Sequence, residues 1–262
     1  MNVFVKHYKE WVLWALMIAF GGIYLSLCFN NNIWTDEGYT MDLLRNCKTF
    51  QEVCNFTAED VHPPLYYLIL KVFTDRFGIQ LLFIKILSIV PMLLTMVLGA
   101  TAIRKEFGFR TALFFILTLG TLPCTMEYAV QARMYTWAIL FVTLCGLEAY
   151  RIAARGKRAD WIGYLLGGVG AAYTHYFAFA AVLWIYGFLF LYLLIRRRKQ
   201  LLKWLATALL SLVIYLPWLT KMSAQVKGVS GNYWIPEIDG KVLLSYFPWI
   251  VNTNLPYVTA VM

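Results

Sequence analysis

Two adjacent carboxylates, Asp36 and Glu37, are the residues of this chain whose types and position are best suited to chemistry. They follow the first apolar run of membrane-spanning length, within the segment Trp34–Tyr39. An ionisable side chain at membrane depth is costly, so it more often marks a reaction or transport site than ordinary packing. A carboxylate can act as a general base, and partial burial or a neighbouring acid raises its pKa. The pair is therefore a candidate for acid–base chemistry at a membrane surface.

The composition places the chain among membrane proteins. Hydrophobic residues make up 61% of the 262 residues, aromatic residues make up 17%, and the mean hydropathy is +0.63. These values far exceed the norm for a soluble domain. Apolar runs near the ~20 residues that a transmembrane helix needs alternate with charge clusters, without the alternation typical of β-strands. We therefore expect an all-α polytopic membrane protein.

Seven apolar runs are predicted to cross the membrane. They are Trp11–Phe29, Ile79–Ile103, Thr111–Met126, Met134–Tyr150, Trp161–Tyr176, Phe177–Ile195 and Leu201–Thr220. The run Pro63–Phe77 is too short to count as another span, carries three charged residues and opens with two prolines that suit a helix start, so we expect a juxtamembrane helix there. Residues 1–220 then form the transmembrane module, and residues 221–262 form an outer loop or tail.

The distribution of Lys and Arg predicts the orientation, because cytoplasmic loops retain these residues. Most of them lie near the N-terminus, in Arg104–Arg110, in Arg151–Arg158 and in Arg196–Lys203, and these segments alternate regularly with the other loops. We therefore expect a multi-pass protein of the plasma (cytoplasmic) membrane with its N-terminus in the cytoplasm. The net charge of +9 is a topology signal and does not indicate a nucleic-acid partner.

The first outer loop, residues 30–62, is long enough to be functional or partly helical. We expect a helix along the interface over Tyr39–Phe50, for which Asp36 would serve as the N-cap if it is not a catalytic group. The loop ends in Val61–Tyr67, where two prolines leave His62 extended just before a helix. His62 is thus predicted to be presented by a loop.

Several separated motifs on the predicted outer face carry a resemblance to a known family. They are Asp36-Glu37, His62-Pro63-Pro64-Leu65-Tyr66-Tyr67, Gln131-Ala132-Arg133-Met134-Tyr135 and Thr174-His175-Tyr176-Phe177, with Gly231-Asn232-Tyr233-Trp234-Ile235-Pro236 in the tail. In this order the chain resembles the bacterial dolichyl-phosphate-mannose-protein mannosyltransferase-like branch of the GT-C glycosyltransferases. The resemblance runs from Trp11 to about Pro236.

The resemblance implies transfer of a sugar from a polyprenyl-phosphate carrier to an acceptor on the outer face, usually with inversion and without a nucleotide cofactor. It implies that Asp36 is the general base. Glu37 is a second candidate catalytic residue, which could instead tune Asp36, cap a helix N-terminus or face away. The resemblance also implies that Arg133 and Tyr135 bind the donor phosphate, and a guanidinium fork suits a phosphate diester and its departing charge. The alternative for Arg133 is interfacial snorkelling or pairing with Glu127.

His62, Glu127 and His175 come from three different outer segments, and some relatives hold a divalent metal ion with similar side chains. A metal site would require these segments to converge, because the chain has no local ligand spacing such as His-x-x-x-His. The alternative is that His175 is a hydrogen-bonded residue of the bundle and that His62 anchors its loop. Sequence leaves both readings open.

Two other functions share the same polar face. A transporter or flippase of a lipid-linked glycan would use it as a vestibule, although paired repeats and broken helices are not evident. An inactive, truncated family member is the third reading, because residues 221–262 hold no clear eighth span. The sugar and the acceptor are not assigned.

Two further patterns concern packing and covalent links. Cys47 and Cys54 lie on the first outer loop, where an oxidising compartment would allow a disulfide, and we leave that bond open. Gly163 and Gly167 have the spacing of close helix packing in membranes.

Overall fold

The computed structural model describes residues 3–29, 32–230 and 239–250, and these ranges contain helices and no strand. The expected all-α class is therefore confirmed. The α-helices are α1 (Val3–Cys28), α2 (Thr35–Asn46), α3 (Phe50–Ala58), α4 (Leu65–Phe77), α5 (Leu81–Leu98), α6 (Arg104–Thr121), α7 (Pro123–Val130), α8 (Tyr135–Ala154), α9 (Arg158–Thr174), α10 (Tyr176–Arg196), α11 (Leu201–Ser230) and α12 (Gly240–Ile250). A π-helical turn, Gly99–Ile103, joins α5 to α6, and a 3₁₀ turn, Arg198–Gln200, precedes α11.

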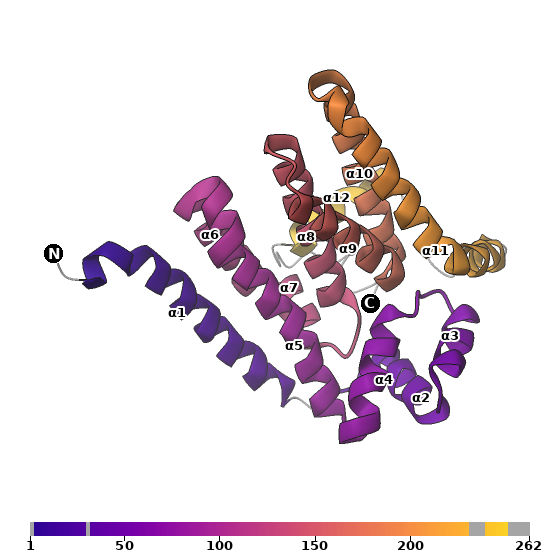
Figure 1. The fold of residues 1–262 in the computed structure, drawn as a ribbon. Coiled ribbons are helices and arrows are strands. Elements are labelled where there is room, and N and C mark those ends of the chain that lie inside the picture. Colours follow the sequence, from indigo (N-terminus) through magenta and orange to yellow (C-terminus); the bar gives the residue numbers. More distant parts are fainter. Residues whose placement is uncertain (1–2, 30–31, 231–238, 251–262) are drawn as a thin grey trace.

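The long helices run side by side as a bundle, and α2, α3 and α4 lie together at one end of it (Figure 1). Helix α1 lies antiparallel to α5. At one end of this pair Arg104 donates to Glu10 at 2.8 Å, and at the other end Lys85 donates to the backbone carbonyl of Asn32 at 3.0 Å. The outer loop is thereby held against the end of the bundle.

Five segments of the described chain are long and apolar enough to cross a membrane, which supports an integral membrane protein. They are His7–Cys28, Leu81–Thr121, Tyr135–Ala154, Tyr176–Arg196 and Arg198–Gly228. The second of them turns back at Gly108, whose φ of 88° is a left-handed conformation that glycine adopts readily. A Cβ at Gly99 would lie 2.8 Å from the ring of Phe115, so the chain before and after the turn packs together. The exact number of seven spans is not confirmed and stays a prediction.

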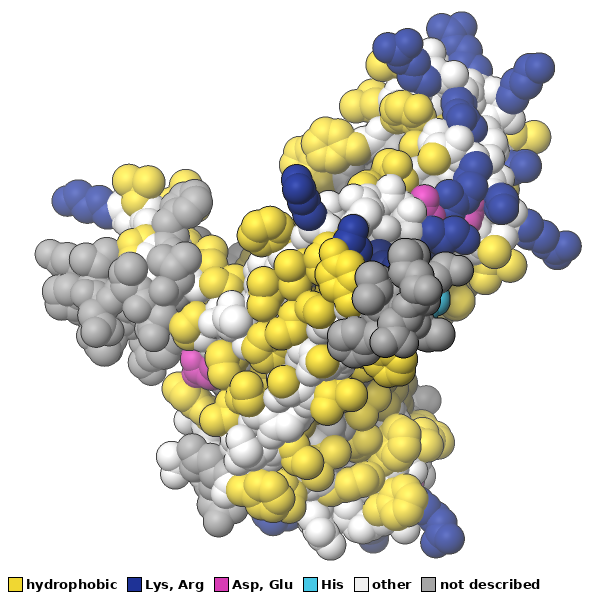
Figure 2. All heavy atoms as spheres, turned by 90° about the vertical axis from the view of Figure 1, so that its left-hand side faces the viewer, with side chains coloured by type: hydrophobic (Ala, Val, Ile, Leu, Met, Phe, Trp, Pro, Cys, Tyr) yellow, Lys and Arg dark blue, Asp and Glu magenta, His cyan; other side chains and the backbone are white. Residues whose placement is uncertain are grey.

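The two ends of the bundle differ in charge. Figure 2 shows Lys and Arg side chains crowded at the upper end, with hydrophobic side chains covering much of the face below. At this basic end the carboxylate of Glu106 accepts hydrogen bonds from Arg151 at 3.0 Å and from Arg155 at 2.5 Å, which ties the α5–α6 turn to α8. The helices α2 to α4 lie at the opposite end.

The first outer loop differs from the expected single helix over Tyr39–Phe50. Helix α2 begins earlier, at Thr35, with Trp34 as its N-cap, so Asp36 lies in the first helical turn and is not the cap. A separate helix, α3, begins after Thr49, because the Thr49 hydroxyl accepts from the Glu52 backbone N–H while the Glu52 carboxylate accepts from Thr49. The helix expected over Pro63–Phe77 is present as α4, and its place at the membrane surface stays a prediction.

Other expected boundaries also shift. The helix predicted to end at Met126 breaks at Leu122, and Pro123 opens the short helix α7, so that Glu127 lies in a helix and not in a turn. Helix α11 continues beyond Thr220 to Ser230. Cys47 and Cys54 are both free, so the disulfide is not formed in the structure. The tail motif Gly231–Pro236 lies outside the described residues.

Helices α8 and α9 approach each other closely at Gly167, as the glycine spacing predicts. A Cβ built on Gly167 would lie 2.6 Å from the backbone nitrogen of Cys145 and 2.9 Å from the backbone oxygen of Phe141. Because these are backbone atoms, a larger side chain cannot be accommodated by a rotamer change. The contact fixes the position of α9, whose C-terminus leads into His175.

We therefore expect Gly167→Ala to destabilise the protein by about 1–3 kcal/mol, the usual cost of overpacking. Gly187→Ala in α10 is the matched control, because a Cβ at Gly187 meets no atom within 4 Å. Thermal unfolding of the two purified variants measures the difference. Equal melting temperatures would contradict the close approach of α8 and α9.

Candidate active site

Glu37 joins the start of α2 to the turn that carries Arg133. One carboxylate oxygen accepts from the backbone N–H of Trp34 at 3.0 Å, which caps α2, and the other accepts from the backbone N–H of Ala132 at 2.7 Å. The Glu37 side chain is only 1% exposed. Of the alternatives for Glu37, the geometry favours the cap over a group that meets substrate.

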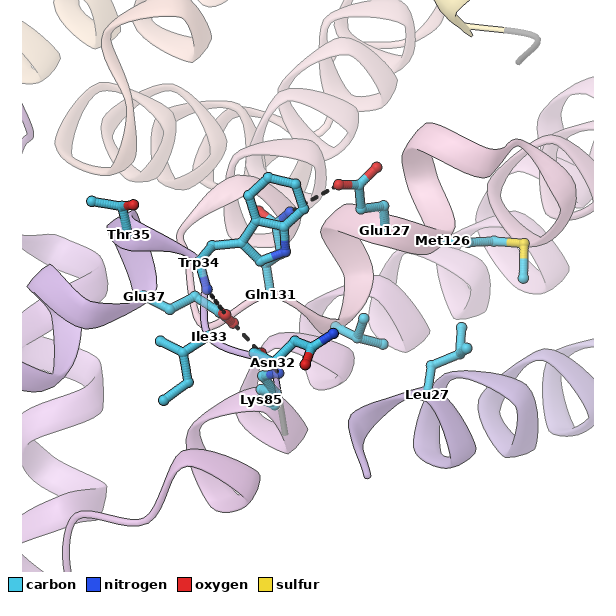
Figure 3. Close-up of a pocket in the computed structure, with 11 residues that line it drawn as sticks. Leu27, Asn32, Ile33, Trp34, Thr35, Glu37, Lys85, Met126, Glu127 and Gln131 are labelled. Carbon is cyan, nitrogen blue, oxygen red and sulfur yellow. Dashed lines mark hydrogen bonds and ion pairs between the residues drawn. The ribbon is translucent and has the colours of Figure 1, made fainter. Parts of the chain in front are cut away.

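Thr40 completes the attachment, one helical turn further along α2. Its hydroxyl donates to the backbone carbonyl of Ala132 at 3.0 Å, so both the N–H and the C=O of Ala132 are held by α2. The ammonium group of Lys85 lies 3.9 Å from the Glu37 carboxylate, and this pair is buried. Figure 3 shows Glu37 between Trp34 and Lys85. The position of the Gln131–Met134 turn is thus set by α2 and α5 together.

Arg133 is the largest fully buried side chain in the described chain, at 2% exposure. One terminal nitrogen, Nη1, donates to the backbone carbonyl of Asp36 at 3.2 Å and to the hydroxyl of Tyr67 at 3.0 Å. The other, Nη2, donates to Nε2 of His62 at 3.1 Å and lies 3.7 Å from the Asp36 carboxylate. The guanidinium therefore joins α2, α4 and the loop before α4.

His62 is held in one tautomer by its two partners. Because Nε2 accepts from Arg133, the proton of a neutral ring lies on Nδ1, which donates to the Asp60 carboxylate at 2.7 Å. Burial is the largest single influence on Asp60 and raises its pKa, but the hydrogen bond and charge of His62, with hydrogen bonds from the Val61 backbone and Tyr39, together hold that pKa below its usual value. Asp60, His62 and Arg133 thus form a continuous hydrogen-bonded chain.

Asp36 has a different environment from the residues around it. Its side chain is 63% exposed, whereas that of Arg133 is 2% exposed. The Asp36 carboxylate and Nη2 of Arg133 form an ion pair. Their distance of 3.7 Å is longer than the hydrogen bonds of the guanidinium. Asp36 therefore presents an accessible carboxylate beside a fixed, buried cation.

His175 and Tyr135 lie against the same centre. The ring centroid of His175 is 6.1 Å from that of His62 and 5.7 Å from that of Tyr135. Burial, with the nearby His62 and Arg133, lowers the pKa of His175 to about 4. Its Nδ1 accepts from the backbone N–H of Phe177 and so caps α10. His175 is therefore a neutral ring at physiological pH, with Nε2 carrying the proton.

Glu127 is not brought into this cluster. It lies in α7, and its carboxylate accepts from the side-chain amide of Gln131 at 3.5 Å, so the alternative in which it pairs with Arg133 is not what the structure shows. Burial raises the pKa of Glu127. Glu127 and Gln131 instead line a separate cavity, which is shown in Figure 3.

The expected metal ligands do not fit a metal ion as they are arranged. Both ring nitrogens of His62 are engaged, Nδ1 of His175 accepts from a backbone N–H, and Glu127 lines the other cavity. Within the described ranges, no three His, Cys, Asp or Glu residues are grouped as metal ligands would be. The divalent metal stays a prediction from resemblance, and no step below uses one.

Three residues of the site were not singled out from the sequence. The Tyr67 hydroxyl accepts a hydrogen bond from Arg133 and orients it, and the Asp60 carboxylate orients His62. Thr40 holds the Arg133 turn. The nearest sequence signal was the position of Tyr67 within the proline-tyrosine motif and of Asp60 two residues before His62, but neither spacing specifies a partner.

A comparison with protein families decides the class. Residues 61–220 match the model of the dolichyl-phosphate-mannose-protein mannosyltransferase family, which is more than half of the chain. The chain belongs to this family. It is therefore a membrane glycosyltransferase of the GT-C type, as the motifs indicate. No curated protein and no solved structure gives a significant match to the chain.

The family match includes His62, Arg133 and His175 but begins after Asp36 and Glu37. The structure supplies the missing link between the two parts. Glu37 binds the backbone of Ala132, and Arg133 binds the backbone carbonyl of Asp36. The acidic pair is thus part of the same folded unit as the matched residues.

The two hydrogen bonds that Glu37 accepts from the backbone of Trp34 and Ala132, which we call the Glu37 clamp, can be tested directly. Glu37→Gln leaves one acceptor oxygen and places an NH₂ group against a backbone N–H, so one buried donor loses its partner. We expect a loss of about 1–3 kcal/mol in stability, the cost of an unsatisfied buried group. Thermal unfolding measures it, with the exposed Asp42→Asn on the same helix as control. A Glu37→Gln variant as stable as the parent would rule out the clamp.

Proposed function

We propose that the protein transfers a sugar from a polyprenyl-phosphate donor to an acceptor hydroxyl at the outer face of the membrane, with Asp36 as general base. The observation that carries the proposal is the accessible Asp36 carboxylate 3.7 Å from the buried guanidinium of Arg133. A base and a phosphate-binding cation lie side by side, and the family is one of glycosyltransferases. Tyr135 and His175 lie beside this centre as supporting groups.

The orientation is part of the proposal. Helix α2, which carries Asp36, lies at the end of the bundle opposite to the basic end, and Arg133 contacts the first turn of that helix. Because cytoplasmic loops retain Lys and Arg, the basic end faces the cytoplasm, and the site faces outward in the plasma membrane. A polyprenyl-phosphate sugar presented at the outer leaflet would meet the site at the depth of its phosphate.

Donor binding has to open the contacts of Arg133, since its guanidinium is closed in by Asp36 and His62. The ion pair with Asp36 is the longest of these contacts and involves the most exposed partner. We infer that a donor phosphate oxygen replaces the Asp36 carboxylate at Nη2. The exchange neutralises the buried cation and at the same time frees Asp36 to accept a proton.

The reaction then follows from these two positions. Asp36 takes the proton of the acceptor hydroxyl while the oxygen of that hydroxyl forms a bond to the anomeric carbon of the donor sugar. The bond from that carbon to the phosphate oxygen breaks, and the phosphate leaves with one additional negative charge. Arg133 stabilises this charge. His175, which is neutral at working pH, can donate a hydrogen bond from Nε2 to the departing phosphate. Attack from the side opposite the phosphate gives inversion.

Asp36→Asn tests the role of the base, because it keeps the shape of the side chain and removes its basicity. We expect the turnover number to fall by about 10²–10⁴-fold, the usual contribution of general-base catalysis. The melting temperature should fall only slightly, because Asp36 is exposed and its backbone carbonyl still accepts from Arg133 when the ion pair is lost. Transfer from a polyprenyl-phosphate sugar by the purified protein is the measurement.

The matched variant is Glu37→Gln, which lowers stability as well as activity. Undiminished transfer by Asp36→Asn would show that Asp36 is not the base. Transbilayer movement of the donor lipid by both the parent and Asp36→Asn, without sugar transfer by either, would support a flippase instead.

A further inference from the structure

A cavity of about 530 Å³ borders the first turn of α2, and neither His62 nor Arg133 is among its lining residues. Thr35 and Glu37, the neighbours of Asp36, line it, as does Gln131 of the turn that carries Arg133. The cavity therefore borders the proposed reaction centre through both chain segments that form it. None of its lining residues has a part in the donor-binding scheme above, apart from the clamp residue Glu37.

The charges around the cavity disfavour an anionic ligand. Its one cationic lining residue, Lys85, donates to the Asn32 carbonyl and is paired with Glu37, so its charge is already compensated. The second acid of the lining, Glu127, forms no ion pair with Lys85, the one cation among the lining residues. A phosphate placed in the cavity would meet a surplus of negative charge, whereas Arg133, which does not line the cavity, offers a cation.

The remaining lining groups suit a sugar. The indole of Trp34 is 47% exposed, and Figure 3 shows it beside the Gln131 amide and the Glu127 carboxylate. A flat aromatic face covers the C–H face of a pyranose ring, an amide both donates to and accepts from its hydroxyls, and a carboxylate accepts from them. Leu27, near the end of α1, and Met126, in α7, add an apolar side where a lipid or alkyl aglycone fits.

We propose that this cavity binds the acceptor, and that the acceptor is a neutral glycoside whose sugar rests on Trp34 and whose hydroxyl reaches Asp36. The assignment rests on the proposed function, because it names the second substrate of the same centre. The donor phosphate at Arg133 and the acceptor sugar in the cavity then meet at Asp36. A phosphorylated acceptor headgroup is excluded from the cavity by its charge.

Protection of an introduced cysteine tests the binding without requiring the natural acceptor. Ile33→Cys places a thiol at the cavity, since Ile33 lines it and is 57% exposed. The full-length variant in nanodiscs is labelled with a water-soluble maleimide, and labelling at position 33 is read by peptide mass spectrometry. Octyl β-glucoside, below its micellar concentration, is the neutral probe, and octyl phosphate is its anionic counterpart.

We expect octyl glucoside to slow labelling at position 33 and octyl phosphate to leave it unchanged. Adding Trp34→Ala should weaken the protection by octyl glucoside about tenfold, the scale of one aromatic contact. Phe50→Ala is the matched control, because Phe50 is similarly exposed and lines a different hollow. Gln51→Cys in that hollow should not be protected by either probe.

Equal protection by octyl phosphate, equal protection at position 51, or protection that survives Trp34→Ala would each overturn the assignment. Transfer assays separate this failure from failure of the proposed function. If Asp36→Asn abolishes transfer while octyl glucoside protects nothing, only the acceptor cavity is wrong. If Asp36→Asn transfers normally, the reaction centre itself is wrong, whatever the labelling shows.

Discussion

The buried guanidinium of Arg133 is the constraint on which the end of the molecule formed by α2, α3 and α4 depends. An uncompensated charge at 2% exposure would cost several kcal/mol, so the surrounding segments must supply acceptors. They come from the α2 backbone at Asp36, from Tyr67 on α4 and from His62 in the preceding loop. These contacts of one side chain thereby hold α2, α4 and the loop before α4 against the bundle.

The two adjacent acids divide the work according to their burial. Glu37 lies inside, and its two oxygens bind backbone N–H groups on separate segments. Asp36 lies outside, and its backbone carbonyl, not its carboxylate, receives the direct hydrogen bond from Arg133. The turn is therefore held in place without using the Asp36 side chain, which keeps its carboxylate available for a proton. A helix N-terminus at this point explains why the acids are adjacent and why they are not equivalent.

Sequence reasoning reached the class of protein because hydropathy and charge act over long stretches. It placed His62 correctly in a loop, since two prolines determine the backbone there. It failed where a boundary depends on a single local interaction, as at Thr49 and Glu52, whose reciprocal hydrogen bonds start a second helix. The roles of Thr40 and Tyr67 were also beyond reach, because each depends on a residue more than sixty positions away. The distinction between Glu37 and Asp36 required knowing which carboxylate is buried.

Equilibrium binding of polyprenyl phosphate to the purified protein in nanodiscs tests whether Arg133 binds the donor phosphate, as we propose. Arg133→Lys keeps the charge but loses the planar fork, and we expect its affinity to fall about tenfold, with a greater loss for Arg133→Gln. Circular dichroism and thermal unfolding establish that both variants are folded. A folded Arg133→Gln variant that binds polyprenyl phosphate as tightly as the parent would contradict the account.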